Sequence, residues 1–190
     1  MRPWALFLAM LLAACGTPPK LNYYTLDTSA PPAAGAGSSP SVFVGPVTVP
    51  DAVDRPQIVL GVAPNQVELE ETHRWAEPLK NAIPRVLADT LGRELGTQNV
   101  MTGRQSSTMA FDYRIAVDVR RFESSYGEGA TLDALWVIRT AKGGEPRTGR
   151  SIVHEAAPSR DAQGIAAAHS RALEQVGREI AGAIRSLGRP

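Results

Sequence analysis

Apolar and polar residues alternate in FDYRIAVDVRRF (111–122), where every second side chain is apolar and most of those between are charged. The apolar members are Phe111, Tyr113, Ile115, Val117 and Val119. Strand side chains point alternately to the two faces of a sheet, so this segment predicts a strand with one buried and one wet face. One wet face is typical of an antiparallel sheet.

Five further segments have the composition of strands, and turn residues separate them. A bend is expected at Gly45-Pro46 within the first segment, and Ala63-Pro64-Asn65 predicts a hairpin between the second and the third. The segments are 41–50, 57–62, 66–71, 131–140 and 150–156.

Two segments show the apolar spacing of amphipathic helices. The first, 77–96, has Pro78 placed for a helix start and Gly96 for its stop, while Pro84 predicts either a kink or a later start. The second, 161–187, has Asp161 as its candidate N-cap. Each helix must cover a surface, so the chain predicts an α+β fold of two layers, a largely antiparallel sheet with two helices on one face.

An 11-residue apolar run, 4–14, ends at Cys15, the one cysteine of the chain. The run is shorter than the about 20 residues that span a bilayer, and Arg2 precedes it, which together indicate a secretory signal. The stretch LAAC (12–15) resembles the lipobox of bacterial lipoproteins, in which the cysteine receives a lipid anchor. The alternative is a free thiol in an ordinary signal peptide.

The predicted organisation is a signal peptide over 1–14, a lipidated tether over 15–22 and a single domain over 23–190. Pro, Gly, Ala and Ser dominate the segment after Leu26, which predicts a flexible loop over about 27–41. The stretch YYTL (23–26) is either a first strand ahead of this loop or a part of the tether.

The chain carries 20 Lys and Arg against 19 Asp and Glu, a formal net charge of +1. Domains that bind nucleic acid normally have a basic excess, so no nucleic-acid partner is expected. The spacing of His73, His154 and His169 fits no helical metal site, and the sequence has no nucleophile elbow or phosphate-binding loop. We therefore expect no enzyme activity, no metal and no cofactor.

The most distinctive internal segments of the sequence are VPDAVDRPQIV (49–59) and residues 65–95. Arg55-Pro56 would enter a strand through extended backbone. His73-Arg74-Trp75 would lie between a strand and a helix, with Trp75 at the seam between sheet and helix or in the core. These five residues are candidates for a structural role or a partner contact.

The lipobox combines with YYTL (23–26), VGPV (44–47), DRPQIV (54–59) and HRWAEPL (73–79) in one chain. In this combination the chain resembles the ABC-transport auxiliary lipoprotein family, of the PqiC type, over nearly all of the mature sequence. Val53 is a minor departure, because the family often has a bulkier residue there.

The resemblance implies a non-enzymatic subunit of a lipid-transport system that links the inner and outer membranes. Its implied partners are a membrane permease, a tube-forming MCE-domain protein and, through its acyl anchor, the lipid of the outer membrane. A homo-oligomeric ring is also implied. Gly16 stands where lipoproteins kept in the inner membrane usually carry Asp, which favours an outer-membrane anchor that faces the periplasm.

One local pattern concerns assembly. In LDALWVIR (132–139), Trp136 and Ile138 fit a buried face, so Leu135 and Val137 should lie on the face that is otherwise wet. Apolar groups there need a cover, which a second subunit or the chain's own loop would provide. Leu135 and Val137 are therefore the candidate oligomer interface.

Two other functions fit the same compartment. One is a lipoprotein that assists the assembly of an outer-membrane barrel or plugs it. The other is a tethered periplasmic hydrolase, which should show a pocket with converging titratable groups.

Overall fold

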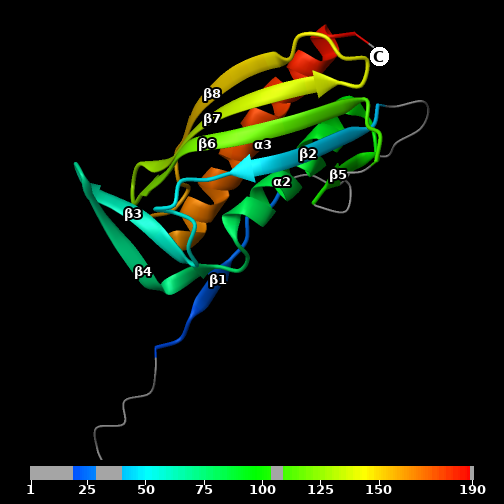
Figure 1. Cartoon of the computed structure of the whole chain (residues 1–190). Coiled ribbons are helices and arrows are strands. Elements are labelled where there is room, and N and C mark those ends of the chain that lie inside the picture. The colour runs from blue at the N-terminus through cyan, green and yellow to red at the C-terminus, as the bar shows by residue number, and fades with distance from the viewer. Residues whose placement is uncertain (1–18, 29–39, 104–108, 189–190) are drawn as a thin grey trace, which may run out of the picture.

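The computed structural model describes residues 19–28, 40–103 and 109–188, so Cys15, the predicted signal peptide and most of the loop over 27–41 lie outside the described residues. A five-stranded sheet carries two helices, α2 and α3, on one face, and a smaller three-stranded sheet extends from one end (Figure 1). Among the helices of the described ranges, none is long and apolar enough to cross a membrane.

The five-stranded sheet has the strand order β5-β2-β6-β7-β8. Pairing is antiparallel from β6 to β8, whereas β2 runs parallel to both β5 and β6. The register between β2 and β6 shifts between Val44 and Val47, at the predicted bend. The bounds are β2 (Val42–Thr48), β5 (Val100–Thr102), β6 (Tyr113–Ser125), β7 (Gly129–Thr140) and β8 (Arg147–Glu155).

The three-stranded sheet has the order β1-β4-β3, with bounds β1 (Asn22–Tyr24), β3 (Gln57–Ala63) and β4 (Gln66–Trp75). β3 and β4 form the predicted hairpin, whose turn holds Asn65 in the left-handed region, at φ 62°. β1 pairs in parallel with the end of β4, so the stretch 23–26 begins as a strand. The hairpin and β1 extend away from the helices at one end of the molecule (Figure 1).

Both predicted helices are present. α2 (Leu79–Leu95) follows Pro78 and ends at Gly96, which adopts the left-handed φ of 64°, and the helix continues through Pro84. α3 (Ala162–Ser186) begins after Asp161, whose side chain accepts a hydrogen bond from the backbone N–H of Gly164 at 2.7 Å.

The α+β class, the mostly antiparallel strands and the helices on one face are therefore confirmed. The strands form two sheets rather than one, because the chain leaves the main sheet after β2 and returns to it only after α2. The short strand β5 was not expected from the sequence.

The core lies between the five-stranded sheet and the helices. The alternation in β6 is confirmed, since Tyr113, Ile115, Val117 and Val119 are each at most 3% exposed. Gly177 of α3 lets the helices approach closely, because a Cβ there would lie 2.6 Å from the Cγ2 atom of Thr90 on α2. The sheet and the two helices thus form one packed body.

Candidate functional site

Three of the distinctive sequence segments meet where the two sheets join. The Trp75 N–H donates to the carbonyl of Pro56 at 2.6 Å, and the Ala76 N–H donates to the carbonyl of Tyr24 at 2.8 Å. The expected position of His73, Arg74 and Trp75 between a strand and a helix is wrong, because β4 continues past the predicted end at Glu71 and includes all three. The extra length is used to pair with β1.

Trp75 is a core residue at this junction, at 5% exposure. Phe122 and His169 stack on each other with centroids 3.7 Å apart, and the Trp75 ring meets both edge-on, at 6.0 and 6.2 Å. The His169 Nε2 atom lies 2.8 Å from the Ser124 Oγ atom. Burial lowers the pKa of His169 to about 3, so the imidazole is neutral at physiological pH.

The Ser124–His169 pair does not form a catalytic triad. Within the described residues, the Nδ1 atom of His169 has no hydrogen-bond partner, so no carboxylate orients the ring. Both side chains are buried. The pair therefore serves packing, with one polar hydrogen bond inside an aromatic cluster.

A second polar cluster holds β1 in place. The Tyr24 ring stacks on His73 with centroids 5.7 Å apart, and the His73 Nδ1 atom lies 3.3 Å from the Glu70 Oε2 atom. The Tyr126 hydroxyl donates to the other oxygen of Glu70 at 3.0 Å. Burial and then this carboxylate raise the pKa of Tyr126, so the phenol stays protonated and remains a donor. The strand that follows the predicted tether is thus fixed to β4 and to the β6–β7 turn.

The two arginines of the distinctive segments are near the surface. Arg74 pairs with Glu71 at 3.8 Å, whereas Arg55 is exposed and has no ion-pair partner in the described ranges. Asp54, next to Arg55, pairs with Lys80 at 3.3 Å. His73, Arg74, Trp75 and Pro56 therefore lie together, and the exposed Arg55 side chain lies at the same corner.

Leu135 and Val137 lie on the face of the sheet that the helices do not cover. Both are half-buried, while Trp136 and Ile138 between and beyond them are core residues at 7% and 1% exposure. Their neighbours on this outer face include Ala116 opposite Val137 and the 59% exposed Ile152 on β8. The placement of Leu135 and Val137 follows the alternation expected from the sequence.

A charged pair lies beside this apolar centre. The Asp133 side chain is 4% exposed and accepts two hydrogen bonds from Arg150, at 2.9 and 2.7 Å, with Arg121 at 3.5 Å. These hydrogen bonds, foremost those of Arg150, lower the pKa of the Asp133 carboxyl. Sequence reasoning missed this arrangement, although an aspartate flanked by apolar residues on the predicted wet face was its visible signal.

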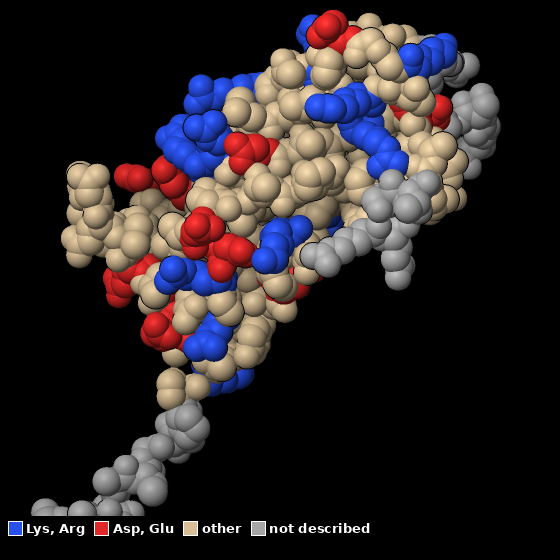
Figure 2. Space-filling view, viewed as in Figure 1, with Lys and Arg blue, Asp and Glu red and all other residues tan. Residues whose placement is uncertain are grey.

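Several cations gather at the other end of the outer face. Arg139 stands directly opposite Arg114 across the two antiparallel strands. Arg139, Lys142 and Arg147 form no ion pair within the part of the chain that the structure describes. Figure 2 shows a largely uncharged centre, with one group of Lys and Arg side chains at its upper right and another at its upper left.

A cleft of about 760 Å³ separates the β3–β4 hairpin from the end of the outer face. The hairpin side is lined by apolar and amide residues, among them Val59, Val62 and Val67. The sheet side carries Arg121, Glu123, Glu128 and His154, and His154 makes its contact with Thr131 at 3.1 Å.

The titratable groups of the cleft come from β6, from β8 and from the turn between β6 and β7. No group of three or more His, Cys, Asp or Glu that could hold a metal ion occurs among the described residues. The cleft is thus open and apolar on one side and charged on the other, which suits a protein segment better than a small polar substrate.

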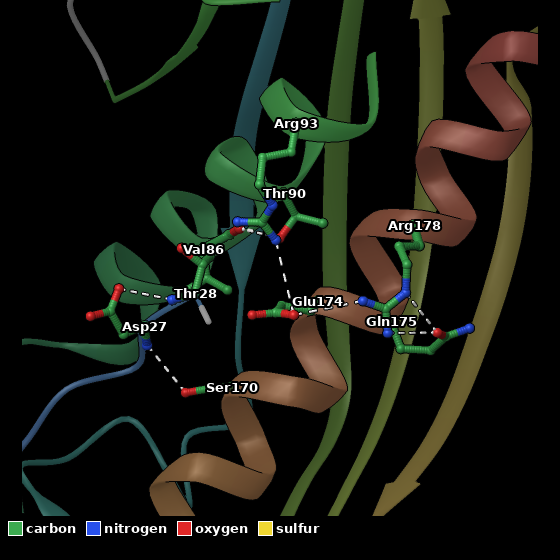
Figure 3. A network of polar contacts seen from close by, with 9 residues as sticks. All are labelled: Asp27, Thr28, Val86, Thr90, Arg93, Ser170, Glu174, Gln175 and Arg178. Carbon is green, nitrogen blue, oxygen red and sulfur yellow. Dashed lines mark hydrogen bonds and ion pairs between the residues drawn. The ribbon is translucent and has the colours of Figure 1, made fainter. Parts of the chain in front are cut away.

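Polar contacts join α2 to α3, and the chain after β1 to α3 (Figure 3). Glu174 of α3, buried at 8% side-chain exposure, lies 3.9 Å from Arg93 of α2 and 3.6 Å from Arg178. The Asp27 N–H donates to the Ser170 Oγ atom at 3.1 Å, which fixes the chain after β1 on α3. The described start of the predicted loop therefore lies on the helix side of the molecule and not on the outer face.

Two solved structures share the fold, and a third is less similar. The protein XCC0632 of Xanthomonas campestris, assigned to the family DUF330, is 23% identical over 86% of this chain and 94% of its own, with a TM-score of 0.68. A second structure, of an uncharacterised protein, is 18% identical over 87% of this chain and 99% of its own, with a TM-score of 0.70. A PelC dodecamer from Paraburkholderia phytofirmans is 14% identical over 77% of this chain and 92% of its own, with a TM-score of 0.41.

Among curated proteins no match is found. The family described as the ABC-type transport auxiliary lipoprotein component matches residues 24–181, from the second residue of the YYTL stretch to the last turns of α3. This range contains the junction, the hairpin and both faces of the sheet. The chain belongs to the ABC-type transport auxiliary lipoprotein family.

Proposed function

We propose that this lipoprotein is a non-enzymatic subunit of an MCE-type lipid-transport system, anchored through Cys15 in the outer membrane and facing the periplasm. The family match over residues 24–181 is the observation that carries the proposal. The partners are the permease and the MCE-domain tube protein of the same system.

We further propose that the subunits assemble as a homo-oligomeric ring through the outer face of the five-stranded sheet. Leu135 and Val137 are half-buried there, with no covering element among the described residues. A second subunit that covers them would remove their apolar surface from water at about 25 cal/mol per Å². Arg55, at the exposed corner of the junction, is the candidate contact for a transport partner.

The anchor and the partner are tested together in cells. Wild-type protein should fractionate with the outer membrane and co-purify with the MCE-domain protein after cross-linking. Cys15→Ser should lose the membrane fraction and the acyl mass while the domain remains folded. A Cys15→Ser protein that keeps its acyl mass would overturn the anchor.

The partner assignment has its own control. Arg55→Glu should lower the yield of the cross-linked MCE-domain protein. Lys80→Glu, a charge reversal on the same corner, is the matched control and should leave that yield unchanged. If wild-type protein instead retrieves an outer-membrane barrel and no MCE-domain protein, the assembly lipoprotein becomes the better assignment.

A further inference from the structure

The β3–β4 hairpin ends in a tip that no other element of the described chain covers. All residues of 61–68 are exposed, including Val62 at 49% and Val67 at 63%. The tip carries no charge from Gly61 to Val67 and projects to the left of the main body (Figure 2). An arm with exposed valines at its end is unusual for a monomer and typical of a contact element.

The hairpin is acidic as a whole. Between Pro56 and Arg74 the chain contains three glutamates, Glu68, Glu70 and Glu71, and no Lys or Arg. Glu70 is held by His73 and Tyr126, and Glu71 by Arg74. Glu68 is exposed next to Val67 and has no ion pair within the described ranges. The tip therefore presents apolar side chains beside an available carboxylate.

The outer face of the sheet presents the complementary arrangement. Its apolar centre, Leu135 and Val137 with Ile152, lies beside Arg139, whose guanidinium has no carboxylate partner in the described part of the chain. Lys142 and Arg147 add positive charge at the same end of the sheet. The two surfaces are thus unlike in shape and opposite in charge, and both have exposed apolar groups.

We infer that the hairpin tip of one subunit docks on the outer face of the next subunit, with Val62 and Val67 over Leu135 and Val137 and with Glu68 near Arg139. A ring requires a contact between two different surfaces of the same chain, repeated around an axis, and this pair of surfaces meets that requirement. Opposite charge beside the apolar contact would fix the register and disfavour face-to-face pairing of two basic faces. This inference rests on the proposed ring and identifies the surface that contacts the outer face of the neighbouring subunit.

Cysteine cross-linking tests the contact directly, because Cys15 is the one native cysteine and is expected to be acylated. Full-length lipoprotein in detergent would be made with Val67→Cys, with Ile152→Cys, and by co-expression of the two. A short bismaleimide should give a cross-linked dimer from the co-expressed pair and little from either single variant. Val67→Cys paired with Ser186→Cys, at the exposed end of α3, is the matched control that should give none.

Each outcome separates this inference from the ring itself. If light scattering shows an oligomer but the co-expressed pair does not cross-link, the hairpin contact is wrong and the ring stands. If Ile152→Cys alone gives the dimer, the outer faces meet each other and the inference is overturned. If the wild-type protein is monomeric at all concentrations, the ring fails first.

A charge exchange tests the contact independently, at two exposed residues whose substitution should not affect folding. Glu68→Arg and Arg139→Glu should each weaken self-association by about tenfold, and the combination should restore most of it. Losses that simply add in the combination would contradict the pairing of these two residues.

Discussion

The two faces of the five-stranded sheet are built from the same strands but serve different purposes. On the inner face, side chains such as Leu132, Trp136 and Ile138 are at most 7% exposed and pack under the helices. On the outer face, alternate residues of the same β7 strand are half-buried apolar groups beside charged ones. The inner face packs the core, whereas the outer face combines the buried Asp133 ion pair with half-buried apolar groups that no described element covers.

The largest expected effect comes from a matched pair of leucines in β7. Leu132→Asp should unfold the domain, because an unpaired charge in the core costs about 4 kcal/mol or more, close to the total stability of many domains. Leu135→Asp should change the free energy of unfolding by about 1 kcal/mol or less, because water reaches the outer face. Urea titration monitored by circular dichroism measures both, and equal losses would show that the faces are not different.

The second expected effect is a pH dependence of the free energy of unfolding, which comes from the buried His169 on the inner side. His169 has a folded-state pKa of about 3 against an ordinary value of 6.5, so below pH 6.5 the unfolded chain binds a proton that the folded chain does not. The stability contributed by neutral His169 is complete above pH 6.5 and is lost as pH falls toward 3. The free energy of unfolding should therefore drop by about 2 kcal/mol between about pH 7.5 and about pH 5.

His169→Phe should remove most of that dependence while it keeps the stack on Phe122. The Asp133 carboxyl of the outer face acts in a different range: its lowered pKa contributes stability above its ordinary value of 3.8, which is lost only as pH falls below that value. A His169→Phe variant whose free energy of unfolding still falls by the full amount between about pH 7.5 and about pH 5 would show that another group is responsible.

A smaller effect separates two glycines of α3. Gly177→Ala should cost about 1 to 3 kcal/mol, because its methyl group would lie 2.6 Å from Thr90 of α2. Gly182→Ala should gain about 0.5 to 1 kcal/mol, because nothing lies within 4 Å and alanine favours the helix. Thermal unfolding of the two variants compares them, and destabilisation of both would mean that α3 is covered more fully than the structure indicates.

Local patterns predicted the parts of the molecule that local rules decide. Alternation identified the faces of β6 and β7, and Asp161 and Gly96 marked helix ends because capping depends on a few neighbouring residues. The division into two sheets could not be predicted, since it depends on β2 pairing in parallel with strands far along the chain. β5 was missed because three residues carry too little pattern to distinguish a strand from a loop.

The candidate site shows the same limit. The sequence identified Arg55, His73 and Trp75 as distinctive, but it could not show that Trp75 packs on His169, which lies 94 positions later in the chain. Leu135 and Val137 were found because their placement needs only alternation. The exposed hairpin tip was missed, since exposure depends on what the rest of the chain leaves uncovered.

The smallest effect on stability comes with the largest expected effect on assembly. Leu135→Glu combined with Val137→Lys changes only outer-face residues, so the free energy of unfolding should stay within about 1 kcal/mol of the wild-type value. The same pair places two charges in the proposed apolar contact, where they would be desolvated without partners. Gln163→Glu with Ser186→Lys, at exposed positions of α3, adds the same two charges on the opposite side of the molecule and should leave assembly unchanged.

Light scattering of this outer-face double variant, alongside its far-ultraviolet circular dichroism, tests the central claim most directly. We expect a folded monomer, with the mass of one processed chain, residues 15–190, and its anchor, and with an unchanged spectrum. A variant that is folded and keeps the oligomeric mass of the wild-type protein would contradict the assignment of the outer face as the assembly interface.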